Sequence, residues 1–244
     1  MEEESPLYKR KVVCDFCMTH YETSRVRKSA RKVLRTDSDF CVHFKGYNPD
    51  FYTVQVCPTC GYASTENFAD GFSLKKRFEF EQKVANNWRK KDFGGERTRE
   101  EAIITFKLAL NCAILREEGF RIICSLLHRI AWLYRVGDDE INENLWLGRA
   151  LESYQNWFSH EKNIENEVKL LFLIGDLNRR LGKFNEAARW FSMIMNDHSY
   201  IAKDPITAKT AREQYANMRE EMKAQKQGGG SNSQPGATDA NDGN

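Results

Sequence analysis

The chain has 244 residues, of which 41% are hydrophobic and 12% aromatic, enough apolar side chain to exclude wholesale disorder. No run approaches the roughly 18 apolar residues that a membrane helix needs. The acidic start, Met1 to Pro6, lacks the apolar segment of a secretory signal, which predicts a cytoplasmic protein without a membrane partner. In a reducing cytosol the seven cysteines are expected to bind metal or to do thiol chemistry.

The formal net charge is only +2, but basic residues outnumber acidic ones between residues 5 and 95. Such an excess is typical of a protein that contacts nucleic acid or another acidic partner. It also suits a metal centre with four thiolates, because zinc with four thiolates carries a net negative charge that nearby Lys and Arg residues balance. Both interpretations stay open at this point.

Two Cys-x-x-Cys pairs dominate the first part of the chain, Cys14 with Cys17 and Cys57 with Cys60. Two intervening residues let both sulfurs of a pair face the same side of a tight turn, and short strands are predicted before each pair, at 7–14 and 51–56. These are the elements of a zinc ribbon, so we predict a structural Zn²⁺ held by four thiolates. The 39 residues between the pairs are roughly twice the length found in compact ribbons, so this insert must fold over the ribbon or against the rest of the protein.

Other interpretations of the cysteines remain. Iron also takes four thiolates, and the spacing does not separate it from zinc. A Cys-x-x-Cys pair can instead form a catalytic disulfide, although Gly61 and Tyr62 read as a turn and not as the start of a helix. His20 is a less suitable substitute ligand. Cys112 and Cys124 lie on apolar helical stretches and are interpreted as core residues.

The insert contains a polar cluster that we consider as an accessory site; its members are Asp37, Asp39, Cys41, His43 and Asn48. Asp37, Asp39 and Asn48, with Arg35 nearby, have the chemistry for acid–base or ion-binding work, whereas turn capping and a salt link to the basic residues are the structural alternative. Cys41 and His43 could be additional ligands of the zinc, but a structural site is full with four ligands, so they are expected to pack beside it. The sequence holds no phosphate loop, nucleophile elbow or His-Glu-x-x-His motif. It therefore predicts no catalytic residues, and enzyme activity is not indicated.

Several motifs in this region carry a family resemblance. They are Cys14-x-x-Cys17, Arg35-Thr36-Asp37-Ser38-Asp39-Phe40, Tyr47-Asn48-Pro49-Asp50-Phe51-Tyr52 and Val56-Cys57-Pro58-Thr59-Cys60-Gly61-Tyr62-Ala63. Together they resemble the bacterial family called domain of unknown function 2225, over nearly the whole chain except the tail. The resemblance implies a cytosolic bacterial protein with a cysteine-rich head and a body of helical repeats. It implies no known activity.

Helical periodicity begins after the second cysteine pair. A helix with Phe78, Val84 and Trp88 near one face is predicted first, and a capping box at Thr98 and Glu101 opens the next. The spacing from Leu171 through Gly175 and Ala187 to Ile194 matches the tetratricopeptide pattern, in which small residues let two antiparallel helices approach closely. A looser copy covers 127–157, and the poorest pairs the Phe78 helix with 102–109. Pro205 starts a last helix that extends to about Lys226.

The predicted fold is thus mainly α, with tetratricopeptide-like antiparallel helix hairpins behind an N-terminal zinc-ribbon-like β head. The predicted divisions are a head at 7–72, a helical body at 73–226 and a flexible tail at 227–244. This architecture favours a non-enzymatic scaffold that binds a protein or peptide in a concave groove. The alternatives are a nucleic-acid-binding module that uses the basic head and, third, a thiol redox enzyme. The sequence does not identify the partner or the oligomeric state.

Overall fold

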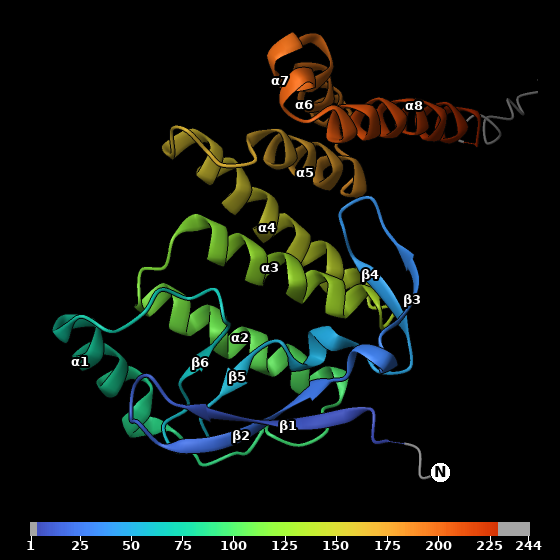
Figure 1. The fold of residues 1–244 in the computed structure, drawn as a ribbon. Helices are drawn as coiled ribbons and strands as arrows, with labels where there is room; N and C mark the ends of the chain where they lie inside the picture. Colours follow the sequence, from blue (N-terminus) through green and yellow to red (C-terminus); the bar gives the residue numbers. More distant parts are fainter. Residues whose placement is uncertain (1–3, 229–244) are drawn as a thin grey trace, which may run out of the picture.

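A computed structural model describes residues 4–228, with side chains up to residue 224, and its chain is mainly helical, as predicted (Figure 1). Almost all of the predicted tail lies outside the described residues. Within the described part of the chain, no helix combines the length and the apolar character needed to cross a membrane.

In the first part of the described chain, three small antiparallel sheets of two strands each form. Strand β1 (Leu7–Val13) pairs with β2 (His20–Val26), β3 (Lys32–Thr36) with β4 (Val42–Lys45), and β5 (Gln55–Val56) with β6 (Ala63–Ser64). The first and third pairs enclose the two Cys-x-x-Cys turns, and the second pair is a hairpin inside the insert. Figure 1 shows that this hairpin runs away from the other strands and lies beside the ends of α3 and α4.

The predicted strand at 51–56 is mostly wrong. Only Gln55 and Val56 are extended, because Pro49–Tyr52 forms a 3₁₀ turn whose first residues are capped by the Asn48 side chain. Asn48 Oδ1 accepts a hydrogen bond from the backbone N of Asp50 at 2.9 Å. A Pro at the first position of such a turn adds no unpaired N–H, so the local chemistry favours the turn over the strand.

Eight helices follow within the described residues, and their bounds are α1 (Leu74–Lys83), α2 (Arg99–Leu115), α3 (Phe120–Arg135), α4 (Glu140–His160), α5 (Glu167–Arg180), α6 (Phe184–Asn196), α7 (His198–Lys203) and α8 (Pro205–Gly228). The capping box at the start of α2 is confirmed, with Glu101 N donating to Thr98 Oγ1 at 3.2 Å and Thr98 N to Glu101 Oε2 at 3.3 Å. Pro205 begins α8, as predicted.

Two helix pairs occupy the segments where the repeat spacing predicted them. Helices α3 and α4 pack along each other, as do α5 and α6, and short connections make each pair antiparallel. Gly175 permits the second pair to approach closely, because a Cβ at this position would lie 2.8 Å from the Phe191 ring. The third predicted pair does not form: α1 ends at Lys83, barely contacts α2, and leaves Phe78 62% exposed.

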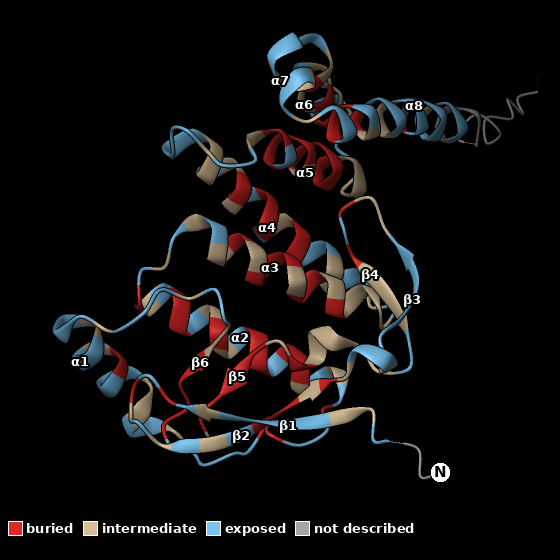
Figure 2. Ribbon diagram, viewed as in Figure 1, coloured by how far each residue is buried: buried red, intermediate tan, exposed pale blue. Residues whose placement is uncertain are grey.

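Figure 2 marks the buried residues along the ribbon. Among the described residues, the buried apolar side chains form two hydrophobic cores. The larger core is continuous from the cysteine turns through α2, α3 and α4 to part of α5. The smaller one joins the other face of α5 to α6 and α8. Since the cysteine turns and α2 share one core, they are packed as one body; the boundary at residue 72 stays a prediction.

Candidate metal centre and the buried network of the insert

The first cysteine turn closes the β1–β2 hairpin. Cys14 O accepts a hydrogen bond from Met18 N at 2.9 Å, and Cys14 N donates to Thr19 O at 3.0 Å. This geometry forces the Met18 backbone into the left-handed region, at φ 59°, where residues other than glycine are strained. The Met18 side chain itself is 65% exposed. The turn therefore fixes both thiols at some local cost in strain.

The second turn repeats the same hydrogen bonds. Cys57 O accepts from Gly61 N at 3.0 Å and Cys57 N donates to Tyr62 O at 2.8 Å. Gly61, at φ 75°, occupies the position equivalent to Met18. Here glycine is also required by space, because an added Cβ would lie 2.4 Å from the Trp88 ring, and the Trp88 indole N–H in turn donates to Pro58 O at 3.0 Å.

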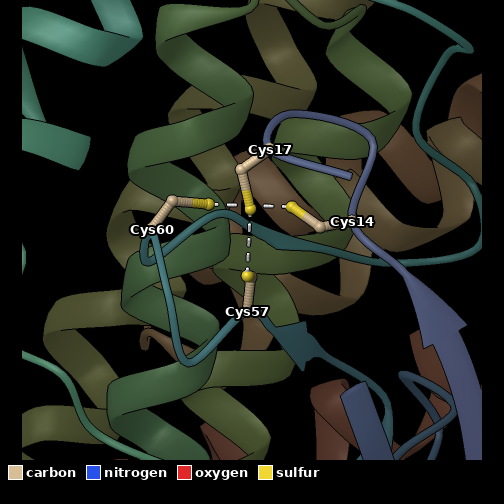
Figure 3. Close-up of side chains that lie close together, drawn as sticks. All are labelled: Cys14, Cys17, Cys57 and Cys60. Carbon is tan, nitrogen blue, oxygen red and sulfur yellow. Dashed lines mark hydrogen bonds between the residues drawn. The ribbon is translucent and has the colours of Figure 1, made fainter. Parts of the chain in front are cut away.

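The four sulfurs converge on a common centre between the two turns (Figure 3). All four Sγ atoms lie within 4.8 Å of one another, and both Cys14–Cys60 and Cys17–Cys57 are separated by 3.6 Å. Metal–sulfur bonds of about 2.3 Å in a tetrahedron place sulfurs about 3.8 Å apart. The four cysteines are thus close enough to hold one metal ion. Four cysteine sulfurs are also a ligand set that structural zinc sites use.

The centre is largely closed to solvent. Cys14, Cys57 and Cys60 are buried and Cys17 is half-buried. An aromatic cluster of Phe16, Tyr62, Phe72 and Phe80 packs beside it. Hydrogen bonds from Cys14 and Cys60 lower the pKa of the Cys57 thiol. None of the seven cysteines, all within the described residues, forms a disulfide.

The insert brings a second set of polar residues into contact with α3. Asp39, at the tip of the β3–β4 hairpin, is completely buried. Both of its oxygens accept from Arg135, at 2.8 Å each, and Oδ2 also accepts from the indole N–H of Trp132 at 3.1 Å. Further contacts come from His128 Nε2 at 3.1 Å and from Arg180 Nη2 at 3.3 Å. The Asp39 carboxylate is therefore contacted by four donor side chains.

Electrostatics explain why this carboxylate stays ionised. Burial alone would raise the pKa of Asp39, but the hydrogen bonds from His128 and Arg135 outweigh it and hold the pKa far below its ordinary value of 3.8. Arg135 has two further acidic partners, Asp37 at 3.0 Å and Glu143 at 2.7 Å, which balance its own charge. A completely buried carboxylate with this many donors locks the hairpin to α3.

A neighbouring contact ties the same tip to α5. Ser38 Oγ donates to Asp176 Oδ2 at 2.7 Å, and Asp176, completely buried, also accepts from Arg179 and Arg180 at 2.9 Å and 3.1 Å. Arg179 continues to Glu221 of α8 at 3.0 Å. A single turn of the insert thus contacts α3 and α5 and, through Arg179, connects to α8.

The residues considered for an accessory site fall into three groups. Asp37, Cys41 and His43 lie together, with their ligand atoms within 4.8 Å of one another. Asp39 belongs instead to the arginine network, and Asn48 caps the 3₁₀ turn.

The remaining candidates are separate from both sites. His20 is exposed at the start of β2, whereas Cys112 and Cys124 are core residues, as predicted.

No role for His128, Arg135 or Arg180 was apparent from sequence patterns alone. A signal was present in α3, because His128, Trp132 and Arg135 are spaced four and three residues apart and so share one helical face. This polar stripe beside the apolar residues of α3 marks the surface on which Asp39 docks.

A mainly α protein with a four-cysteine centre in its β-stranded head is the class that this fold and site define. The chain belongs to the family described as "Uncharacterized protein conserved in bacteria (DUF2225)", whose model matches residues 7–218. This confirms the resemblance found in the sequence. No curated protein and no solved structure matches the chain.

Proposed function

We propose that the four cysteines bind a structural zinc ion and that the protein is a scaffold that holds a peptide. The convergence of all four sulfurs supports the metal, because two separate redox pairs would have no reason to share one centre. Four protein ligands in a largely closed site favour a structural over a catalytic ion, since catalytic zinc keeps an open position. The predicted cytoplasmic location agrees with seven cysteines that form no disulfide.

Elemental analysis of the full chain tests the metal. We expect the zinc content of Cys57→Ser to be one ion per chain lower than that of the wild type, together with loss of the ordered packing of the head, because metal binding at the four-cysteine centre supplies folding free energy. Cys124→Ser, which removes a buried thiol far along the chain in α3, is the matched control and should keep the metal. An iron content, or a folded Cys57→Ser variant with native zinc, would contradict the proposal.

The scaffold role rests on a groove where α3, α4 and α5 meet. Its cavity of about 220 Å³ is smaller than an ordinary small-molecule site, and it suits a single large side chain of a peptide. The groove combines apolar side chains with two cationic residues, Arg121 and Lys169, and one acidic residue, Glu165, which lies 3.9 Å from Arg121. Its apolar lining includes Tyr154, Trp157, Leu170 and Leu173. We propose that tetratricopeptide-like packing of α3–α6 forms this groove and that it takes an apolar anchor residue flanked by acidic residues.

Selection of displayed random peptides on the zinc-loaded full chain tests this role. We expect enriched peptides to combine an aromatic or large aliphatic residue with acidic neighbours, and to lose at least tenfold in affinity for Trp157→Ala. Ile141→Ala, at the exposed start of α4, is the control because Ile141 is 85% exposed and outside the groove. Peptides that bind both variants equally, or no enrichment at all, would reject the groove as the binding site.

Nucleic-acid binding is the second candidate, and one observation favours it. Arg25 and Arg31 line a cavity of about 230 Å³ together with Thr53 and Thr65. The same arginines are partly engaged, since Arg25 lies 3.5 Å from Glu66 and Arg31 donates to a backbone carbonyl. Binding of labelled single-stranded DNA or RNA that weakens steeply with salt would support this candidate, and no binding at low salt would remove it.

A further inference from the structure

The β3–β4 hairpin brings three metal-binding side chains of different kinds to one place. Asp37 precedes the turn, Cys41 follows it, and His43 comes two residues later on β4. Asp37 N donates to Cys41 O at 2.8 Å, which fixes the two residues across the turn. The carboxylate, thiol and imidazole ligand atoms all lie within 4.8 Å of one another.

We propose that Asp37, Cys41 and His43 form a second metal site, which takes a divalent transition metal with zinc as its best fit. One sulfur, one nitrogen and one oxygen ligand suit zinc or a similar borderline ion, whereas Mg²⁺ and Ca²⁺ require oxygen ligands throughout. The site is independent of the four-cysteine centre and does not rest on the scaffold role. Three protein ligands leave a fourth position for water or a small ligand, which is the arrangement found in catalytic zinc sites.

The surroundings of the site hold its ligands in position. Asp37 Oδ2 accepts hydrogen bonds from Arg135 at 3.0 Å and from His43 Nε2 at 2.9 Å. Arg135 is in turn held by Asp39 and Glu143, so its positive charge is already balanced when a cation approaches. The hydrogen bond from Arg135 to Asp37 is of the kind that orients a carboxylate when it binds a metal ion. A bound ion would replace the His43–Asp37 hydrogen bond and leave the Arg135 contact in place.

Access is from the solvent side. The side chains of Asp37 and His43 are each 15% exposed, whereas Cys41 is buried at the bottom of the site. One cation lies over the opening: Arg35 Nη2 is 3.2 Å from His43 Nε2, and Arg35 Nε is 3.7 Å from Asp37 Oδ1. The Arg35 side chain is 67% exposed and free to move into solvent. Arg35 therefore competes with a metal ion for these two ligands.

The test is the zinc content of the full chain after equilibration with excess Zn²⁺ and gel filtration, combined with a Co²⁺ titration followed by absorption. We expect two ions per chain in the wild type and one in Cys41→Ser and in His43→Gln. The strong thiolate-to-cobalt absorption of the four-cysteine centre should remain in both variants. Arg35→Ala should bind the second ion at least threefold more tightly, because it removes the competing cation.

Two controls keep the outcome decisive. Cys124→Ser removes a buried thiol on α3 and should retain two ions. If Cys41→Ser fails to fold, His43→Gln decides, because that side chain is partly exposed and outside the hydrophobic cores. One ion per wild-type chain, or two ions in His43→Gln, would overturn the second site. Cobalt absorption that falls in Cys57→Ser but is identical in the wild type, Cys41→Ser and His43→Gln would support the four-cysteine centre and reject the second site.

Discussion

Replacing Asp39 by Asn tests whether the buried carboxylate holds the insert to the helices. An amide keeps one acceptor oxygen but turns a donor group toward Arg135 and loses the negative charge. Breaking a buried ion pair by removing one partner costs about 3–5 kcal/mol. Both arginines keep other acidic partners, Arg135 with Glu143 and Arg180 with Asp176, so we expect the lower end, about 3 kcal/mol.

Urea denaturation of the zinc-loaded chain, followed by circular dichroism, measures this loss; urea is preferred because a salt denaturant would screen the ion pairs. Glu186→Gln is the matched control, since it removes a carboxylate from the exposed Glu186–Arg189 pair on α6 and should change the free energy of unfolding by less than about 1 kcal/mol. A loss of less than 1 kcal/mol in Asp39→Asn would refute the reasoning that this network fastens the hairpin.

The same carboxylate predicts a dependence on pH. The pKa of Asp39 is lowered in the folded protein, so below its ordinary value of 3.8 the unfolded chain binds the proton first. The stability that Asp39 contributes is therefore complete above that value and falls as the pH is lowered. We expect the difference in free energy of unfolding between wild type and Asp39→Asn to shrink below about pH 4. A difference that stays constant down to pH 3 would show that the ionised carboxylate is not its source.

Three further substitutions test local packing, each measured by the same urea denaturation. Gly61→Ala should destabilise the metal-loaded protein by about 2–4 kcal/mol, through a clash with Trp88 and backbone strain at positive φ. Met18→Gly, at the equivalent position of the other turn, should be neutral or stabilising by up to about 1 kcal/mol, and a marked loss would contradict the equivalence of the turns. Gly175→Ala should cost about 1–3 kcal/mol because its Cβ meets Phe191, and a neutral result would show that the two helices separate easily.

The parts of the fold that the sequence predicted depend on short-range patterns. The two cysteine turns need only two residues between their sulfurs, and the capping box at Thr98 needs only Glu101 three residues later. The close approach at Gly175 follows from the spacing of small residues within one helix pair. Each of these patterns lies within a single turn or hairpin, so neighbouring residues alone carry the information.

The errors and omissions have the opposite origin. Phe51 was predicted in a strand because of its aromatic and β-branched neighbours. Instead, Asn48 and Pro49 start a 3₁₀ turn that includes Phe51 and prevents the strand from forming there. The partners of Asp39 are 89 to 141 residues away along the chain, at His128 and Arg180. No spacing rule joins residues at that distance, and only the packed fold shows which polar stripe meets which turn.

The long insert explains how a small metal centre and a set of helices form one structure. The cysteine turns lie at the two ends of the insert and share the larger core with α2 and α3. Asp39, near the middle of the insert, is held by α3. Ser38 beside it contacts Asp176 of α5, and α5 packs with α6 in the smaller core. The insert is therefore fixed at both ends and at its middle. Because Asp37, Cys41 and His43 lie at that middle contact, an ion bound there would sit on the connection between the head and both helical cores.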